Sequence, residues 1–194
     1  MAIASSWDLW WPFLTLFAVL LCFFGKAKGK LFLLSVGVCL LVVDGICTNG
    51  LKKIIQRPRP EAVLDGVRQV DLPKKNPRFL ALREKPRVWY SVARIQPVRG
   101  GSFPSGHAAN NFCVITVAVL IFRKWWIWLG YFPAALVAYS RIYVGSHWPS
   151  DVLFAIPMSL GVTLLLMSGL SYLAEKFEPY LQKKYNRIYK IFTS

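Results

Sequence analysis

The sequence predicts an all-α fold, a polytopic membrane bundle of about five transmembrane helices with one interfacial segment. Three observations predict it. Of the 194 residues, 55% are hydrophobic, the mean hydropathy is +0.42, and five runs approach or reach the roughly 20 apolar residues that cross a bilayer. This composition is typical of membrane proteins rather than of chains folded around a soluble core. The length favours one membrane-embedded domain over residues 1–194.

Each apolar run is expected to form one helix. In chain order the runs are Leu9–Phe24, Leu31–Leu51, Ala108–Phe122, Trp125–Val144 and Val152–Ala174. We expect the first to be a permanent helix, because no basic residue precedes it as one would in a signal peptide. Tryptophans cluster near the ends of the runs, where amphipathic rings lie at headgroup level. The four cysteines lie inside the runs, so neither a disulfide framework nor a zinc site is indicated.

A basic insert, residues 56–103, separates the second and third runs and is expected outside the membrane, as a lid or rim on its surface. Its six prolines exclude a long helix, while "FLALRE" predicts a short helix and "RVWYSVARI" an interfacial strand or helix. A plain count of Lys and Arg would place this insert in the cytoplasm. The clusters "GKAKGK" and "RKWW" and the basic tail resemble cytoplasmic anchors, however, which favours the outer face for the insert.

Ionisable residues at the ends of the runs are candidates for a site, because charged groups at membrane depth are costly. In "KKIIQRPRP", six residues separate Lys52 from Arg59, and the alternative is a basic anchor whose side chains snorkel to the interface. In "FPSGH", Ser105 suits a helix N-cap and Gly106 allows a ligand to approach the backbone. The alternative for that stretch is a plain turn and cap.

The stretch "SRIYVGSHWPSD" places Arg141, His147 and Asp151 together. Pro149 suits the first position of a helix, so the fifth helix is expected to start near Trp148. His147 and Asp151 are four residues apart, which lets the carboxylate reach back to the imidazole. The alternatives are that Asp151 only complements the positive end of its helix and that His147 is an interfacial residue holding a backbone carbonyl.

Alternating helix directions bring these three patterns to one membrane face. Cations and helix-end amides there favour a tetrahedral oxyanion such as phosphate. A histidine held by a carboxylate is an activated nucleophile or base, and a second histidine, His107, can serve as the acid. Asp44, Thr48 and Lys52 share a helix face toward this site, and Asp44 is left open between a supporting contact and a helix–helix hydrogen bond.

In sequence order, Lys52-x6-Arg59-Pro60, Pro104-Ser105-Gly106-His107 and Ser140-Arg141-x5-His147-x3-Asp151 closely resemble the three-part signature of the type 2 phosphatidic acid phosphatase (PAP2) superfamily. The match covers residues 52–151. The resemblance implies that His147 attacks phosphorus to form a phosphohistidine, that Asp151 fixes the tautomer of His147 and stabilises its imidazolium, and that His107 protonates the leaving oxygen. It implies these residues around the phosphoryl oxygens: Lys52, Arg59, Ser105, Gly106 and Arg141. It implies no metal and no cofactor.

The expected function is therefore that of a metal-independent phosphatase of membrane lipids. The basic insert favours a bulky, multiply anionic headgroup, so lipid A 1-phosphate or undecaprenyl diphosphate is preferred. The alternatives are a phosphatidylglycerolphosphate or phosphatidate phosphatase, a lipid phosphotransferase and, in another class, an anion channel or transporter. The expected partners are a lipid phosphate and an anionic bilayer, with no nucleic acid and an oligomeric state that the sequence leaves open. The resemblance places the chain in a bacterial inner membrane, with its site on the periplasmic face.

Overall fold

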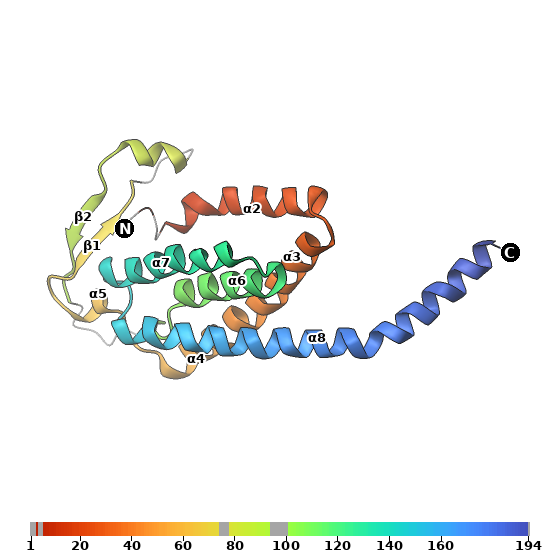
Figure 1. Cartoon of the computed structure of the whole chain (residues 1–194). Coiled ribbons are helices and arrows are strands. Elements are labelled where there is room, and N and C mark those ends of the chain that lie inside the picture. The colour runs from red at the N-terminus through yellow and green to blue at the C-terminus, as the bar shows by residue number, and fades with distance from the viewer. Residues whose placement is uncertain (1–2, 4–5, 74–77, 94–100, 194) are drawn as a thin grey trace.

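The computed structural model describes the chain except residues 1–2, 4–5, 74–77, 94–100 and 194. The elements, in chain order, are α2 (Trp7–Phe24), α3 (Ala27–Leu40), the π-helix η1 (Leu41–Thr48), α4 (Asn49–Ile55), α5 (Pro60–Val63), β1 (Arg68–Asp71), the 3₁₀-helix η2 (Arg78–Arg83), β2 (Arg87–Tyr90), α6 (Gly106–Phe122), the 3₁₀-helix η3 (Trp125–Gly130), α7 (Tyr131–Tyr143) and α8 (Pro149–Thr193). The long helices lie roughly side by side in one bundle (Figure 1). The all-α prediction is confirmed, apart from one two-stranded sheet.

All five predicted runs are helical, but they differ in length. Two helical stretches, Ala27–Val63 and Pro149–Phe177, are long and apolar enough to cross a membrane, and only 28% and 22% of their most apolar windows are buried inside the protein. Apolar helices that turn most of their surface outward suit a hydrocarbon solvent rather than a water-soluble fold. The helices over Leu9–Phe24 and Gly106–Phe122 are apolar but shorter. The number of membrane crossings therefore stays a prediction.

The fourth run, expected as one helix, is divided into two elements. Trp125–Gly130 forms a 3₁₀-helix and only Tyr131–Tyr143 is α-helical. Pro133 is the third residue of α7, and it is tolerated there because an N–H group in the first turn of a helix has no helical acceptor, whereas inside a longer helix it would remove a hydrogen bond to the preceding turn.

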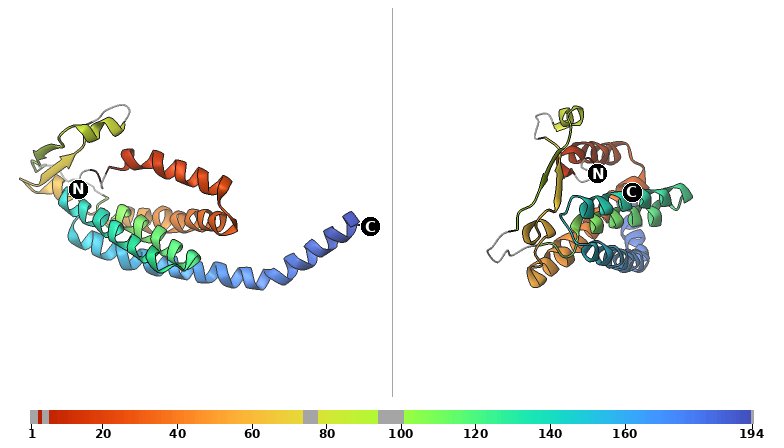
Figure 2. Two further views of the ribbon diagram at one scale, coloured as in Figure 1. Left: turned by 45° about the horizontal axis from the view of Figure 1, so that its top comes forward. Right: turned by 90° about the vertical axis from the view of Figure 1, so that its left-hand side faces the viewer.

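Helix α6 is the centre of the bundle. It packs against α3, η1, α7 and α8, and the two views of Figure 2 show it enclosed by these helices. Small residues at the contacts, Cys39, Ala108, Ala109, Cys113 and Ala155, have no exposed surface. Small side chains let helices approach closely, which is how helices associate where lipid tails compete for apolar contact.

The basic insert forms an antiparallel hairpin whose register pairs Arg68 with Tyr90 and Asp71 with Arg87. The hairpin lies at the end of the bundle where α7 ends and α8 begins (Figure 1). Leu72 packs with Leu9 at the start of α2 in a small apolar cluster. The guanidinium of Arg68 bonds the hydroxyl of Tyr143 at 2.8 Å and lies over its ring. The stretch "RVWYSVARI", expected as a strand or a helix, contains the strand β2, and its last two residues lie outside the described part of the chain. The helix expected within "FLALRE" is present as the 3₁₀-helix η2.

Helix α8 begins at Pro149, as expected, but continues to Thr193, well beyond the predicted apolar run. Its C-terminal part projects from the bundle and bends (Figure 1). Pro179 lies inside this part and removes one helical hydrogen bond, which accounts for a bend.

Candidate active site

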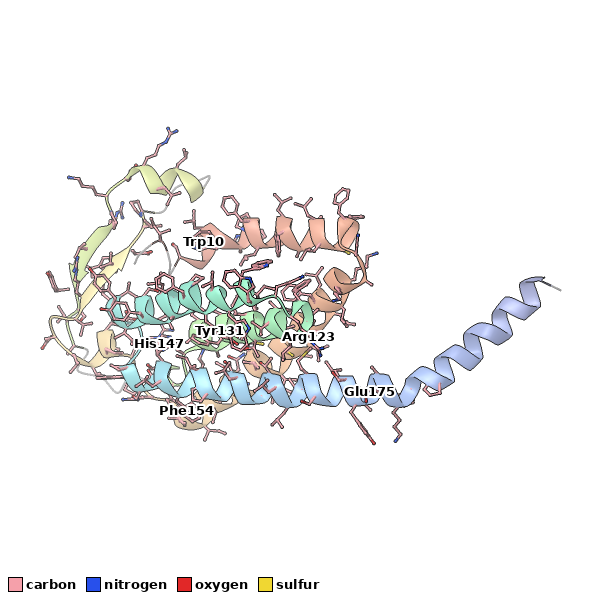
Figure 3. The ribbon with its side chains drawn as sticks, viewed as in Figure 1. Trp10, Arg123, Tyr131, His147, Phe154 and Glu175 are labelled. Carbon is pink, nitrogen blue, oxygen red and sulfur yellow. The ribbon has the colours of Figure 1, made fainter. Side chains whose placement is uncertain are left out.

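Four chain segments that are far apart in sequence meet at one end of the bundle. They are the end of α4, the start of α6, the end of α7 and the start of α8. The backbone N–H of Ser105 donates to the carbonyl of Asp151 at 3.1 Å, and the N–H of His147 donates to the carbonyl of Arg141 at 3.2 Å. Figure 3 shows His147 at this end of the bundle and Arg123 at the other. The backbone N–H of Ser102, just before the second motif, also donates to the carbonyl of Arg57 at 3.0 Å, so backbone bonds connect all three predicted motifs.

His147 is held by the backbone carbonyl of Ser102, which lies 2.7 Å from Nδ1. A carbonyl oxygen can only accept, so Nδ1 carries the proton and donates it to Ser102. The other ring nitrogen, Nε2, then bears a lone pair in the neutral ring. The resemblance assigns the fixing of this tautomer to Asp151, yet its Oδ2 lies 3.7 Å from Nδ1, too far for a direct hydrogen bond. In this structure Ser102 makes the direct contact.

Asp151 is fully buried and joins three segments. Its Oδ1 accepts from Arg57 Nη1 at 2.9 Å. Its Oδ2 accepts from the backbone N–H of Trp148 at 2.9 Å and from the hydroxyl of Ser102. The bond to Trp148 is the carboxylate part of a capping box at the start of α8. Asp151 therefore caps its helix, as the simpler interpretation of the sequence held, and also supports the residue that orients His147.

His147 is poised as a neutral base. It is 4% exposed, and this burial, together with the charge of Arg141, lowers the pKa of His147 from 6.5 to about 4. Burial disfavours the charged ring, and a nearby cation disfavours it further. The imidazole is therefore uncharged at neutral pH, with its Nε2 lone pair available.

His107 and Ser105 stand at the start of α6 with unused polar atoms. His107 Nε2 and Ser105 Oγ are buried and have no hydrogen-bond partner among the described residues. Ser105 occupies the N-cap position, as predicted, but its hydroxyl makes no capping bond. Buried polar groups without a partner are costly, so both atoms are suited to a ligand.

Lys52, Thr48 and Asp44 converge on Gly106, the first residue of α6. A Cβ placed on Gly106 would lie 3.3 Å from Asp44 Oδ1, 3.5 Å from Lys52 Nζ and 3.6 Å from Thr48 Cγ2. The absence of a side chain at Gly106 thus lets the ammonium of Lys52 reach the amide end of α6. Asp44 lies beside the same point, which resolves its position though not its role.

Arg59 and Arg141 complete the positive surroundings. The two histidines both experience the charges of Arg59 and Arg141, and His107 also experiences that of Lys52. The side chain of Arg59 is 43% exposed, and its Nη1 lies 3.6 Å from Oε1 of Glu61. Every residue predicted for the site is therefore at this end of the bundle, with Arg59 at its rim.

Two residues of the network were not predicted, Ser102 and Arg57. Arg57 donates to Asp151 and, at 2.8 Å, to the hydroxyl of Ser150, and its guanidinium lies 5.0 Å from the ring centre of Trp148. The doubled Arg-Pro of "QRPRP" is the sequence feature that marks Arg57 as a second candidate beside Arg59. Ser102 carries no such signal, because it acts through its backbone carbonyl.

Comparison with known proteins identifies a family. A family model described as the PAP2 superfamily matches residues 31–175, which is more than half of the chain. The chain is 48% identical over 52 residues to an undecaprenyl-diphosphatase of Sulfolobus acidocaldarius, covering 27% of this chain and 25% of that protein. It is 27% identical over 163 residues to a lipid A 4'-phosphatase of Porphyromonas gingivalis, covering 81% of this chain and 59% of that protein. The chain thus spans less than two thirds of the length of either relative.

The fold also has a counterpart among solved structures. It is similar to that of a transmembrane PAP2-type phosphatidylglycerolphosphate phosphatase from Bacillus subtilis, with a TM-score of 0.51 and 22% identity, over 87% of this chain and 72% of the other. At this identity the similarity establishes the fold alone.

Proposed function

The chain belongs to the PAP2 superfamily, and from that premise we propose that it is a membrane-embedded, metal-independent lipid phosphatase with His147 as nucleophile. The observation that carries the proposal is the contact of 2.7 Å between His147 Nδ1 and the Ser102 carbonyl oxygen, which places the proton of the neutral ring on Nδ1 and leaves Nε2 with its lone pair. Around it lie the cations of Lys52, Arg59 and Arg141 and the amide end of α6.

The first chemical step is attack of the His147 Nε2 lone pair on phosphorus. A P–N bond forms and the bond from phosphorus to the lipid oxygen breaks. His107, which carries a second proton as the imidazolium once the phosphate anion offsets the surrounding cations, donates that proton to the leaving oxygen. The buried carboxylate of Asp151, 3.7 Å from Nδ1, stabilises the positive charge that develops on the ring. A carboxylate near an imidazole favours its charged form.

The second step is attack of water on the phosphohistidine, for which His107, now neutral, accepts the proton. The P–N bond breaks, inorganic phosphate leaves and His147 returns to its neutral form. Charge on the equatorial oxygens is compensated by Lys52, Arg59, Arg141, the Ser105 hydroxyl and the amides at Gly106 and His107. Phosphoryl transfer depends mainly on such positioning and electrostatic compensation, so the proposed reaction uses no metal ion.

The proposed substrate is a phosphate on a membrane lipid, either lipid A 1-phosphate or undecaprenyl diphosphate. One relative is named an undecaprenyl-diphosphatase and the other a lipid A 4'-phosphatase, so the names support the two lipid classes but not the 1-position of lipid A. The name of the structural counterpart keeps phosphatidylglycerolphosphate as an alternative. We also propose that the site lies in the outer leaflet of an inner membrane, because the clusters of Lys26, Lys28 and Lys30 and of Arg123 and Lys124 lie at the far end of the bundle.

The test is phosphate release by the detergent-purified protein from a panel of these lipids, with glucose 6-phosphate as a soluble comparison. We expect release from at least one lipid phosphate and its loss in His147→Ala, with the thermal midpoint of the variant measured to show that it is folded. Near-normal turnover by folded His147→Ala would reject the assignment. Release from glucose 6-phosphate in preference to every lipid would reject the lipid substrate.

A further inference from the structure

A cavity of about 320 Å³ lies between α2, α6 and α7. Five of the seven side chains that line it are apolar, and they come from α2 and α7: Trp10, Leu14, Pro133, Leu136 and Val137. The two polar side chains, His107 and Asn111, are on successive turns of α6. Figure 3 shows Trp10 on α2 at the same end of the bundle as His147. The cavity therefore begins at the proposed acid of the reaction.

From His107 the cavity leads into the apolar layer. Val137 is four residues before Arg141 on α7, and Pro133 is eight residues before it. At a rise of about 1.5 Å per residue, these positions lie roughly 6 and 12 Å below the phosphate-binding end. On the α2 side, Trp10 and Leu14 are 45% and 50% exposed, so this wall also faces the surrounding bilayer. The cavity thus joins the site to the hydrocarbon region.

The polar lining offers little to a polar ligand below His107. The side-chain amide of Asn111 donates to the carbonyl of His107 at 2.9 Å, within its own helix. A sugar or glycerol headgroup would therefore find one side-chain acceptor in the lining below His107, the Oδ1 of Asn111, and burying its further hydroxyl groups without partners is costly. A hydrocarbon chain has no such requirement.

We propose that this cavity receives the first segment of the hydrocarbon chain of the lipid substrate. The inference rests on the proposed function, in which His107 protonates the oxygen that leaves with the lipid. The cavity wall that contains His107 is then on the leaving-group side of phosphorus, which is where the chain must go. Among the proposed substrates, a polyprenyl diphosphate suits this wall better than lipid A 1-phosphate, because only its inner phosphate separates the leaving oxygen from the hydrocarbon chain, whereas in lipid A a sugar does.

The cavity acts by positioning rather than by hydrophobic affinity. A lipid chain that moves from the bilayer into the cavity exchanges one apolar environment for another, so burial of its surface contributes little. A chain seated beside His107 restricts the orientation of the phosphate ahead of it, however, and correct orientation accelerates reaction. At about 320 Å³ the cavity is at the small end of ligand pockets, so it holds one part of a chain and not a whole lipid.

The experiment compares butyl, octyl and dodecyl phosphate with p-nitrophenyl phosphate, all in one detergent. Leu14→Trp and Val137→Phe fill the cavity from opposite walls. Leu16→Trp is the matched control, because Leu16 is on the same helix, is 57% exposed and does not line the cavity. The control also reports how far chain length acts through partition into micelles, which is the same for every variant.

We expect kcat/KM of the wild type and of Leu16→Trp to rise with chain length. In Leu14→Trp and Val137→Phe the rise is lost, with dodecyl phosphate reduced by about tenfold or more and p-nitrophenyl phosphate changed by less than about twofold. Activity on p-nitrophenyl phosphate shows in each case that the variant is folded.

An undiminished rise with chain length in both filled variants would overturn the inference while leaving the phosphatase assignment intact. An equal loss on all four substrates would also overturn it, because the substitution would then act on the site itself. Failure of the wild type to release phosphate from any substrate would instead reject the proposed function.

Discussion

At the scale of single residues, the bond from His147 to the Ser102 carbonyl decides which ring nitrogen can react. Arg57 supports this bond indirectly. Its Nη1 donates to Asp151 Oδ1 at 2.9 Å, and Asp151 in turn accepts from the hydroxyl of Ser102. We predict that Arg57→Gln lowers kcat by about tenfold or more while KM changes little, because Asp151 loses the cation that fixes it and no longer holds Ser102, and with it the His147 ring, in position for attack. The variant also leaves that carboxylate free to stabilise the imidazolium, which raises the pKa of His147 and moves the acid limb of kcat/KM to higher pH.

Arg59→Gln is the matched control, since Arg59 is two residues away in "QRPRP" and has its proposed contact with the substrate phosphate. It should raise KM and leave the thermal midpoint nearly unchanged. Steady-state kinetics and thermal unfolding of both variants provide the comparison. A rise in KM alone in Arg57→Gln, with no change in stability or pH profile, would show that Arg57 binds substrate instead.

The burial of His147 also makes stability depend on pH. The pKa of His147 is about 4 in the folded protein, against 6.5 for an ordinary histidine. Between these values the unfolded chain takes up a proton that the folded chain refuses, so the free energy of unfolding falls as the pH falls from about 6.5 to about 4. Across this pH range the contribution of His147 to the free energy of unfolding changes by an amount on the order of 3 kcal/mol.

Thermal midpoints at pH 7.5 and 4.5 measure this dependence. We expect the acid-induced decrease to be smaller in His147→Gln than in the wild type, because glutamine does not titrate. Equal decreases in the two proteins would mean that His147 is not buried in its neutral form.

At the scale of elements, the hairpin of the basic insert supports the loop that carries His147. Gly145 has a φ of +67°, and a Cβ there would lie 2.3 Å from Val67 Cγ1 and 2.8 Å from Gln69 Nε2. We predict that Gly145→Ala lowers both kcat, by about tenfold or more, and the thermal midpoint. The added methyl group must displace either the hairpin or the His147 loop, and small displacements of catalytic groups are costly.

Gly66→Ala is the control for backbone strain. Gly66 has a φ of +72°, and a Cβ there would meet nothing within 4 Å. The two variants therefore share the cost of a left-handed alanine, and only Gly145→Ala adds the collision. If both variants lose the same activity, the hairpin does not brace the loop.

The elements also show where sequence patterns were sufficient. Apolar runs and helix-start residues predicted the positions of the helices, because both are short-range sequence patterns. The alternating direction of the helices then predicted that Lys52, His107 and His147 would meet at one end of the bundle. The π-helix Leu41–Thr48 was not predictable in this way. It differs from an α-helix in its hydrogen-bond register, which apolar spacing does not reveal. The length of α8 was missed because apolar periodicity ends where its charged part begins.

At the scale of the whole molecule, the site depends on contacts between segments that the sequence separates. Three features each connect two or more separate segments, either helix ends or the insert. They are the Ser102 carbonyl, the Arg57–Asp151 pair and the cavity beneath His107. Motif spacing identified the residues that match the PAP2 signature. It could not identify those that support them through backbone atoms or across helices, because such contacts are set by packing.

The most direct test of the account is isolation of the covalent intermediate. Lipid diphosphate labelled with ³²P at its terminal phosphate is mixed with the detergent-purified protein, quenched in alkali and digested, and the labelled peptide is sequenced. The account predicts label on His147 in the wild type, and none in His147→Gln, which should also release no phosphate. Phosphate release by folded His147→Gln, or label on His107 in place of His147, would contradict it.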